Sequence, residues 1–455
     1  MRKLLVANRG EIAARIIRSA RELDIATVAV YSQADRHGLP VQLADEAVEI
    51  GPPQASRSYL NVDALLKAAH SVGADAIHPG YGFLAESAAF ARRVEAEGLI
   101  FVGPSADVIA MMGDKAVARA TAQRAGVPTV PGSEGVLHDE QEAMAVAAKI
   151  GYPIMIKAAA GGGGRGIRVV QNGSALIEQM AQARAEAEAA FGDGSVYLER
   201  FVPRARHIEV QILGDGKRAV HLYERECSLQ RRRQKVLEEA PSPALDADQR
   251  EALCASAVRL AELVGYRGAG TIEYLYDEQR REFYFIEMNT RIQVEHPITE
   301  MVTGIDIVRE MLMISAGAPL RLQQSEITVR GAAIECRINA EDTQRNFAPS
   351  LGTVSALHWP AGFGIRIESQ MFAGFQVPPF YDSMLAKLIA WDESRPQAIA
   401  RMRCALRELR IEGIETTQPL HQALLADPQV QAGEFHTAYL EDWLATRTAL
   451  AKSAA

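Results

Sequence analysis

Short apolar runs and amphipathic stretches take turns along the first part of the chain. Residues 3–7 are mostly apolar, residues 11–23 carry apolar side chains at helical spacing, and residues 26–31 are again mostly apolar. This order predicts strand, helix and strand, because apolar positions recur every three to four residues on one face of a helix. The same order continues as far as 75–78 and beyond. Strands that alternate with helices indicate a parallel α/β unit, which we expect to end near Gly113.

The pattern changes twice further along the chain. Residues 152–170 predict strand, glycine-rich loop and strand, and from Val196 the alternation becomes typical of strands. A second change, near Arg330, opens a unit that closes with a helix over 395–409. We therefore expect a mixed α/β and α+β chain with the following divisions: an N-terminal α/β domain of residues 1–113, a middle region of 114–329, a C-terminal β-rich domain of 330–446 and a frayed tail of 447–455.

Composition and charge exclude several classes of protein. The 455 residues are 48% hydrophobic and 23% charged, and the formal net charge is −8. An acidic balance argues against nucleic acid or an anionic membrane as the main partner. No apolar stretch approaches the length of a membrane span, and the N-terminal apolar run is too short for a signal peptide, so we expect a cytoplasmic protein. The four cysteines form no CxxC pair, which favours buried free thiols over a zinc site or disulfides.

Four consecutive glycines stand between the two apolar runs of residues 154–170. Glycine lets backbone N–H groups approach phosphate oxygens closely, although ordering such a loop is costly. The segment lacks both the GxxxxGK[ST] pattern of a P-loop and the GxGxxG pattern of a dinucleotide site. We interpret it as a hairpin lid over a nucleotide, with Lys157 as a phosphate-facing charge. The alternative is a surface hairpin that binds nothing.

Two further segments place charged groups where an anion could bind. Polar and apolar residues alternate over 207–213, which predicts a strand with His207, Glu209 and Gln211 on one face. The run 230–235 then concentrates four cations within six residues. A solvated charge run is the ordinary explanation of such a cluster, whereas the functional explanation is an anion-binding wall.

Two strands predict a cluster of carboxylates. Residues 271–276 and 282–289 flank a turn, and a hairpin centred near Arg280 would place Glu273 opposite Glu287. Opposed carboxylates repel unless a cation lies between them, and hard oxygen ligands suit Mg²⁺ completed by phosphates. Polar residues continue at every other position beyond the second strand. If this segment stays extended, one edge would form an active-site floor from Glu287, Asn289, Arg291, Gln293 and Glu295.

The third unit repeats this kind of pattern. Glu335, Arg337 and Asn339 share one face of the strand that we expect within 334–342. Arg337 could pair with neighbouring acids for structural reasons, or it could stabilise negative charge during a reaction. The sequence leaves both interpretations open.

Long segments of the chain resemble the biotin carboxylases, the ATP-grasp enzymes that carboxylate biotin in acetyl-CoA carboxylase and its relatives. Matches this long and this numerous are far more specific than one short motif. The resemblance implies an ATP-grasp fold with a Rossmann-like N-terminal domain, a glycine-rich lid at about 131–203 and a β-rich C-terminal domain. The matching segments occur in order over most of the chain: 7–11, 78–84, 112–115, 157–166, 230–241, 287–300, 335–342 and 378–384.

The resemblance also implies a role for each candidate residue, carried over by position. The catalytic residues would be Lys235, Arg291, Glu295 and Arg337. Bicarbonate would contact Lys235, Arg291, Gln293 and the backbone of Val294, biotin would contact Arg337, and Mg²⁺ or Mn²⁺ would bind Glu273, Glu287 and Asn289. ATP would be bound by Lys115, Lys157, Gly163, Gly164, Glu199, Arg200, Phe201, Val202, His207, Gln230, Arg233 and Leu275.

These roles imply that ATP and bicarbonate first form carboxyphosphate. Glu295 would take the proton of bicarbonate and so raise its reactivity towards the γ-phosphate. The lid would protect the labile product from water, and the phosphate released from it could deprotonate biotin N1′ while Arg337 stabilises the ureido oxygen. One position departs from the family, because Arg233 stands where many members have His. Arginine keeps a cation there but does not titrate near neutral pH.

The resemblance implies partners as well. The chain has no Met-Lys-Met carrier signature, so we expect biotin to arrive on a separate biotin carboxyl carrier protein, with carboxyltransferase subunits completing the enzyme. Two alternatives stay open: another ATP-grasp ligase that makes an acyl phosphate, such as a carbamoyl-phosphate synthetase half, or a nucleotide-binding subunit without activity. A homodimer is also expected, from matching interface positions at Arg15, Arg18, Glu22, Phe363 and Arg366.

Overall fold

The chain begins with a parallel sheet flanked by helices. The computed structural model describes residues 1–133, 135–159 and 167–453. The N-terminal strands pair in the order β3-β2-β1-β4-β5, all parallel, which confirms the predicted α/β unit. Its elements are β1 (Lys3–Val6), α1 (Gly10–Glu22), β2 (Ala26–Ser32), α2 (Leu39–Leu43), β3 (Glu46–Gly51), α3 (Val62–Ser71), β4 (Ala76–His78), α4 (Ala88–Ala96), β5 (Ile100–Phe101) and α5 (Ala106–Gly113).

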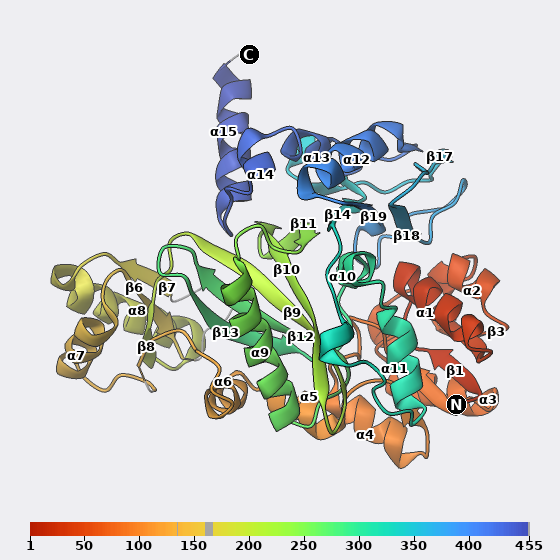
Figure 1. Ribbon diagram of the computed structural model, residues 1–455, viewed down its shortest axis with the longest axis horizontal. Helices are drawn as coiled ribbons and strands as arrows, with labels where there is room; N and C mark the ends of the chain where they lie inside the picture. The colour runs from red at the N-terminus through yellow and green to blue at the C-terminus, as the bar shows by residue number, and fades with distance from the viewer. Residues whose placement is uncertain (134, 160–166, 454–455) are drawn as a thin grey trace.

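A large antiparallel sheet forms the middle of the molecule (Figure 1), with the strand order β13-β12-β9-β10-β11-β14-β19-β18. Ile208 and Val210, on one face of β9, pack in a core that includes Leu253 of α9, as their alternation predicted. The opposite face is buried as well, because Glu209 and Gln211 are both 0% exposed. The elements are β9 (Ala205–Asp215), β10 (Ala219–Arg231), β11 (Gln234–Ala240), α9 (Ala247–Leu263), β12 (Arg267–Asp277), β13 (Glu282–Asn289), α10 (His296–Thr303) and α11 (Ile307–Ser315).

A smaller sheet lies to one side of the large sheet, at the left of Figure 1. Strands β6 and β7 pair as the predicted hairpin, and β8 pairs with the other edge of β6. Gly163 and Gly164, the candidate phosphate contacts between β6 and β7, lie outside the described residues. Helices α7 and α8 cover this sheet with apolar side chains such as Ile150 and Met180. The elements are α6 (Lys115–Arg124), α7 (Glu140–Ile150), β6 (Ile154–Ala158), β7 (Ile167–Val170), α8 (Leu176–Phe191) and β8 (Val196–Arg200).

The C-terminal strands extend the large sheet. β14 pairs with β11 of the middle region, and β19 and β18 follow in the same sheet. Main-chain hydrogen bonds therefore join strands from both sides of the boundary that was expected at residue 330. The tail that was expected to be frayed from residue 447 is helical as far as Ser453, as part of α15. The elements are β14 (Ala332–Asn339), β15 (Glu341–Asp342), β16 (Ala348–Pro349), β17 (Ala356–His358), β18 (Ile365–Ser369), β19 (Met384–Asp392), α12 (Arg395–Glu408), β20 (Arg410–Glu412), α13 (Gln418–Leu424), α14 (Pro428–Ala432) and α15 (Tyr439–Ser453).

Two expectations about the whole chain can be compared with the structure. Cys227, Cys254 and Cys336 are buried free thiols, as expected, whereas Cys404 is exposed. Cys404 is exposed because α12 packs its other face, which carries Met402 among other buried residues, against the sheet. Within the described residues, no helix combines the length and the apolar character needed to cross a bilayer.

Candidate active site

Three neighbouring strands place carboxylates side by side on one face of the large sheet. Glu273 of β12 is the register partner of both Glu287 on β13 and Glu209 on β9. The predicted opposition of Glu273 and Glu287 is therefore confirmed. The turn pairs Asp277 with Glu282, which alone would place Ile286 opposite Glu273, and a one-residue register shift between Glu273 and Tyr274 brings Glu287 there instead. Carboxylates alone would repel one another at this separation, so the row requires cations among them.

Lys235 is the cation at the centre of this row. Its Nζ lies 2.5 Å from Oε2 of Glu209, 3.0 Å from Oε1 of Glu273 and 2.6 Å from Oε1 of Glu295. Burial by itself would lower the pKa of Lys235, but Glu209, Glu295 and Glu273 together raise it well above its usual value. The ammonium group therefore stays charged although it is largely buried.

His207 adds a second positive charge beside Glu273. Its Nε2 lies 3.1 Å from Oε2 of Glu273 and 3.7 Å from Oε2 of Glu209. Burial by itself would lower the pKa of His207, but the two carboxylates raise it to about 9. Burial likewise opposes ionisation of Glu273, and Lys235 and His207 outweigh it and hold the pKa of Glu273 below its usual range.

The polar residues after β13 converge, although the predicted extended strand is absent. β13 ends at Asn289, and residues 290–295 form an irregular turn before α10. Arg291 donates to Oδ1 of Asn289 at 2.9 Å and to Oε1 of Gln293 at 2.8 Å, and Gln293 donates to Glu273 at 3.3 Å. An extended strand would instead have spread residues 287–295 over about 26 Å, at about 3.3 Å per residue.

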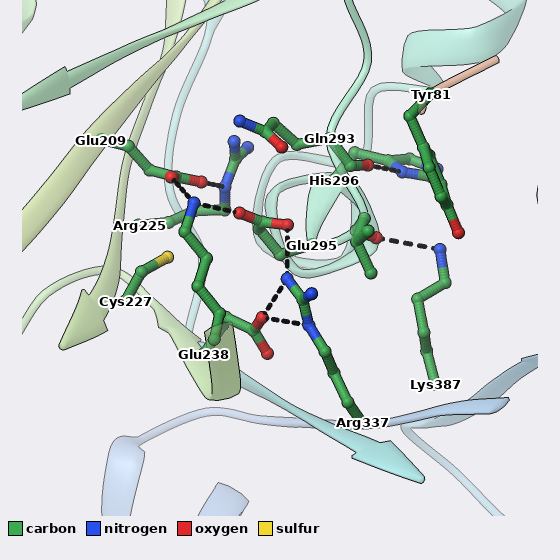
Figure 2. A network of polar contacts seen from close by, with 12 residues as sticks. Tyr81, Glu209, Arg225, Cys227, Glu238, Gln293, Glu295, His296, Arg337 and Lys387 are labelled. Atoms are coloured by element: carbon green, nitrogen blue, oxygen red, sulfur yellow. Dashed lines mark hydrogen bonds and ion pairs between the residues drawn. The ribbon is translucent and has the colours of Figure 1, made fainter. Parts of the chain in front are cut away.

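Glu295 lies between Lys235 and a second cation, Arg337 (Figure 2). Nη2 of Arg337 is 2.9 Å from Oε2 of Glu295, and its Nε donates to Oε1 of Glu238 at 2.6 Å. Burial and repulsion from Glu209 would raise the pKa of Glu295, yet Lys235 and Arg337 outweigh them and lower it. Burial raises the pKa of Glu238 to about 7. Glu295 is therefore ionised at neutral pH.

Sequence reasoning missed two residues of this cluster, Glu86 and Arg225. Oε2 of Glu86 accepts from Nε of Arg291 at 2.8 Å, and its Oε1 accepts from the N–H of Thr290 at 3.1 Å. Arg225 is 0% exposed and donates to Glu209 at 2.6 Å. The register of β10 with β9 pairs Arg225 with Glu209, but no local pattern indicated that register. Glu86 follows the motif of residues 78–84 directly, which was its one available signal.

The described residues that are expected to contact the nucleotide come from both sheets and from the segments beside them. Lys157 of β6 donates to Glu199 of β8, which also accepts from Arg119 at 2.8 Å. Lys115 is exposed at the start of α6, and its charge acts on Glu287. This electrostatic contact places Lys115 on the side of the site where Glu273 and Glu287 lie.

The segment after β8 packs against β12 and β13. Arg200 donates to the hydroxyl of Tyr284 at 2.9 Å, and Val202 and Leu275 share an apolar cluster with Tyr284. The N–H of Phe201 donates to the carbonyl of Pro153 at 3.1 Å. These contacts make an apolar wall beside the polar row, which suits a flat heteroaromatic ring.

The four cations of the basic run do not form one anion-binding wall. Lys235 joins the carboxylate cluster, and its register partner Gln230 donates to the carbonyl of Cys227 at 2.8 Å. The other cations lie at the tip of the β10–β11 hairpin, because Arg232 and Arg233 occupy a tight turn with φ of 49° and 65°. The guanidinium of Arg231 instead lies 3.8 Å from the centre of the ring of Phe347.

Glu273, Glu287 and Asn289 together offer the oxygen ligands that a divalent cation prefers. Glu287 accepts no hydrogen bond from the part of the chain that the structure describes, and burial and then repulsion from Glu273 raise its pKa. Oδ1 of Asn289 faces Arg291, and its buried Nδ2 has no described partner. A cation beside Glu287 would relieve the repulsion, so these residues fit Mg²⁺ or Mn²⁺. His207 also lies close to Glu273 but is protonated, which makes it unsuitable as a ligand.

Comparison with families of known proteins covers most of the chain. Residues 1–109 match the biotin carboxylase N-terminal domain, and residues 335–442 match the biotin carboxylase C-terminal domain. Residues 114–323 match the ATP binding domain of the carbamoyl-phosphate synthase L chain.

Whole proteins and solved structures match along nearly the full length. Biotin carboxylase 1 of Bacillus subtilis is 53% identical, over 97% of this chain and 99% of its own. The biotin carboxylase of Pseudomonas aeruginosa is 54% identical, over 97% and 98%. The bicarbonate-bound biotin carboxylase domain of a thermophilic 2-oxoglutarate carboxylase superposes with a TM-score of 0.92 and 48% identity, over 97% and 98%. The dimer of this domain from Hydrogenobacter thermophilus, with MgADP and bicarbonate, gives 0.85 and 49%, over 97% of both chains. By sequence and by fold, this chain belongs to the biotin carboxylase family.

Proposed function

We propose that the protein uses ATP and bicarbonate to carboxylate N1′ of biotin presented by a carrier protein. The observation that supports this most is the position of Glu295, an ionised carboxylate held between Lys235 and Arg337 beside the pair Glu273 and Glu287. Bicarbonate is both an anion and a weak nucleophile. It therefore needs cations to bind it and a base to take its proton, and this cluster offers both within hydrogen-bonding reach.

Activation of bicarbonate is the first step. Lys235 and Arg291 would bind its negative oxygens, with Gln293 and the backbone of Val294 fixing its orientation. Glu295 would take the proton from the O–H of bicarbonate, and the freed oxygen would attack the γ-phosphorus of ATP. The bond from that phosphorus to ADP breaks, which gives carboxyphosphate and ADP.

The nucleotide would lie between the two sheets. Lys115, Lys157 and Arg233 would face the phosphates, together with Gly163 and Gly164. Glu273, Glu287 and Asn289 would hold Mg²⁺ or Mn²⁺, which neutralises charge on the phosphate oxygens when bound. The remaining contacts, towards the adenosine, would come from Glu199, Arg200, Phe201, Val202, His207, Gln230 and Leu275.

Carboxyl transfer to biotin would use Arg337. Carboxyphosphate breaks into CO₂ and phosphate, and the phosphate takes the proton of N1′. The nitrogen then attacks CO₂ while negative charge collects on the ureido oxygen. Arg337 suits this oxygen because guanidinium keeps its charge throughout and is anchored on its other side by Glu238.

We further propose that carrier and carboxyltransferase are separate subunits of a cytoplasmic complex and that this chain is a homodimer. Phe363 is 78% exposed, and Arg18 and Glu22 are exposed on α1, so all three can meet another subunit. Arg15 and Arg366 instead bind Glu300 inside the chain, so they would support the interface from beneath. Light scattering that gives twice the chain mass supports the dimer, and the mass of a single chain refutes it.

The reaction can be tested with purified protein, ATP, Mg²⁺ and radiolabelled bicarbonate. We expect phosphate release that requires bicarbonate and rises when free biotin is added, with acid-labile label fixed on biotin. Stimulation by ammonia without any response to biotin would indicate a carbamoyl-phosphate type of ligase. ATP binding without turnover under all these conditions would indicate a non-catalytic subunit.

A further inference from the structure

Lys387 is a buried cation that none of the roles above uses. It lies on β19, is 0% exposed, and is the register partner of Arg337 on β14. Its Nζ donates to the carbonyl oxygen of Val294 at 2.9 Å and lies 3.1 Å from Oε2 of Glu11. The bond to Val294 joins residues separated by 93 positions in the sequence.

Stability does not explain why this position carries a charge. Removing a buried cation from water is costly, and apolar residues in place of a buried ion pair are often equally stable. The charge of Lys387 acts on buried Glu335, but Lys387 does not hydrogen-bond to it, because both oxygens of Glu335 lack a hydrogen-bond partner among the described residues. The lysine is instead directed to the backbone of the turn between β13 and α10.

That turn has no regular secondary structure of its own. Residues 290–295 belong to no helix or strand, and Glu295, the residue before α10, makes no side-chain cap to the helix. Glu86 holds the start of the turn, and two adjacent strands of the C-terminal region hold its end, because Arg337 bonds the Glu295 side chain and Lys387 bonds the preceding peptide group. The N-terminal region holds Lys387 in turn, through Glu11, whose other oxygen accepts from Tyr81.

We propose that Lys387 is a positioning residue that fixes the turn bearing Gln293, Val294 and Glu295 so that these groups meet bicarbonate together. The inference rests on the proposed function. The peptide group that Lys387 holds joins Val294 to Glu295, so a rotation of this group displaces the Glu295 side chain and the Val294 backbone that follows Gln293. A misplacement of about 1 Å in such groups can cost roughly 10²-fold in rate.

The test uses Lys387→Met, which keeps the length of the side chain and removes the donor. We expect the KM for bicarbonate to rise at least tenfold while the KM for ATP changes less than threefold. The double variant Glu11→Gln with Lys387→Met removes both charges and so relieves the uncompensated carboxylate. If positioning is the role, the double variant keeps the raised bicarbonate KM. If Lys387 only neutralises Glu11, the double variant returns to the wild-type value and overturns the proposal.

Arg9→Met is the matched control, because Arg9 is another largely buried cation that joins the N- and C-terminal regions. It pairs with Asp35 at 2.7 Å and lies 4.0 Å from the centre of the ring of Tyr381, and no described contact links it to residues 290–295. A normal bicarbonate KM in Arg9→Met is expected, and a rise equal to that of Lys387→Met would overturn the proposal. Failure of both Lys387 variants to fold would also overturn it, by assigning the residue to the fold. An inactive wild-type enzyme would instead refute the proposed function.

Discussion

The carboxylate cluster has two halves, one at β12 and β13 and the other at β11 and β14. Both contain buried glutamates, but the two halves balance the charges of these glutamates differently. On the side of β12 and β13, Glu287 faces Glu273, accepts no described hydrogen bond and has a raised pKa. On the side of β11 and β14, Glu295 is 0% exposed, and each of its oxygens meets a cation of the protein, Lys235 or Arg337. One half is incomplete without an external cation, and the other is complete before any ligand arrives.

This difference matches the chemistry proposed for each half. A metal and its nucleotide bring positive and negative charge together, so the half that binds them can remain unbalanced until they enter. A base must be ionised and correctly oriented before the reaction starts, because reorganising charges during the reaction would add to the barrier. The first half should therefore respond to metal concentration and the second half to loss of its fixed charges.

The largest loss of activity should come from removing the base of the complete half. Glu295→Gln keeps the shape of the side chain but cannot take a proton, so we expect biotin carboxylation to fall about 10³-fold. The KM for ATP should change less than threefold. Steady-state phosphate release and label fixation measure both values, and a loss of less than tenfold would show that another group acts as the base.

Loss of a metal ligand from the incomplete half should lower the activity and change how the rate depends on the Mg²⁺ concentration. Glu287→Gln removes one of the two opposed carboxylates, and we expect kcat/KM for ATP to fall roughly 10²-fold. The Mg²⁺ concentration for half-maximal rate should rise in the same variant. An unchanged metal requirement, measured in titrations at fixed free ATP, would contradict the assignment of this pair to the metal.

Burial of a carboxyl group in the half at β11 and β14 should also make the free energy of unfolding depend on pH. Burial raises the pKa of Glu335 well above its usual value of 4.5, so the folded chain keeps a proton that the unfolded chain releases. This contribution to stability is present at acidic pH and is lost as pH rises above that usual value towards the folded pKa. Glu335→Gln should therefore raise the free energy of unfolding by about 1–2 kcal/mol at pH 8, and by less at pH 5.

Urea unfolding of Glu335→Gln and of the wild type at the two pH values measures this difference. The comparison between pH values serves as the internal control, since packing changes caused by the amide act equally at both. An equal gain at pH 5 and pH 8, or a loss at pH 8, would show that Glu335 is ionised in the folded protein.

The smallest effect should come from the hairpin tip outside both halves. Arg233→His restores the residue that many family members carry, and histidine tolerates the positive φ of this turn better than most residues. We expect the affinity for ATP to change less than tenfold. An ATP titration measures it, and abolished turnover would place Arg233 inside the catalytic cluster.

Local patterns in the sequence determined much of the framework. Apolar periodicity predicted the strand and helix order of the first unit, the hairpin of β6 and β7, and α12. The opposition of Glu273 and Glu287 was also predicted, although the short turn fixes the register only as far as Tyr274 and a one-residue shift then brings Glu287 opposite Glu273. In these cases the partners are close in the sequence, and the physical rule acts over a few residues.

Tertiary structure alone decided how the site is assembled. Lys235 meets Glu295 across 60 positions and Arg337 meets Glu238 across 99, and the turn of residues 290–295 folds away from the strand geometry that its alternation predicted. The continuity of the large sheet across residue 330 and the contacts of Glu86, Arg225 and Lys387 belong to the same group. Periodicity reports which face of an element is buried, but it carries no information about which distant charge lies there. That choice depends on how strands far apart in the sequence become neighbours in one sheet.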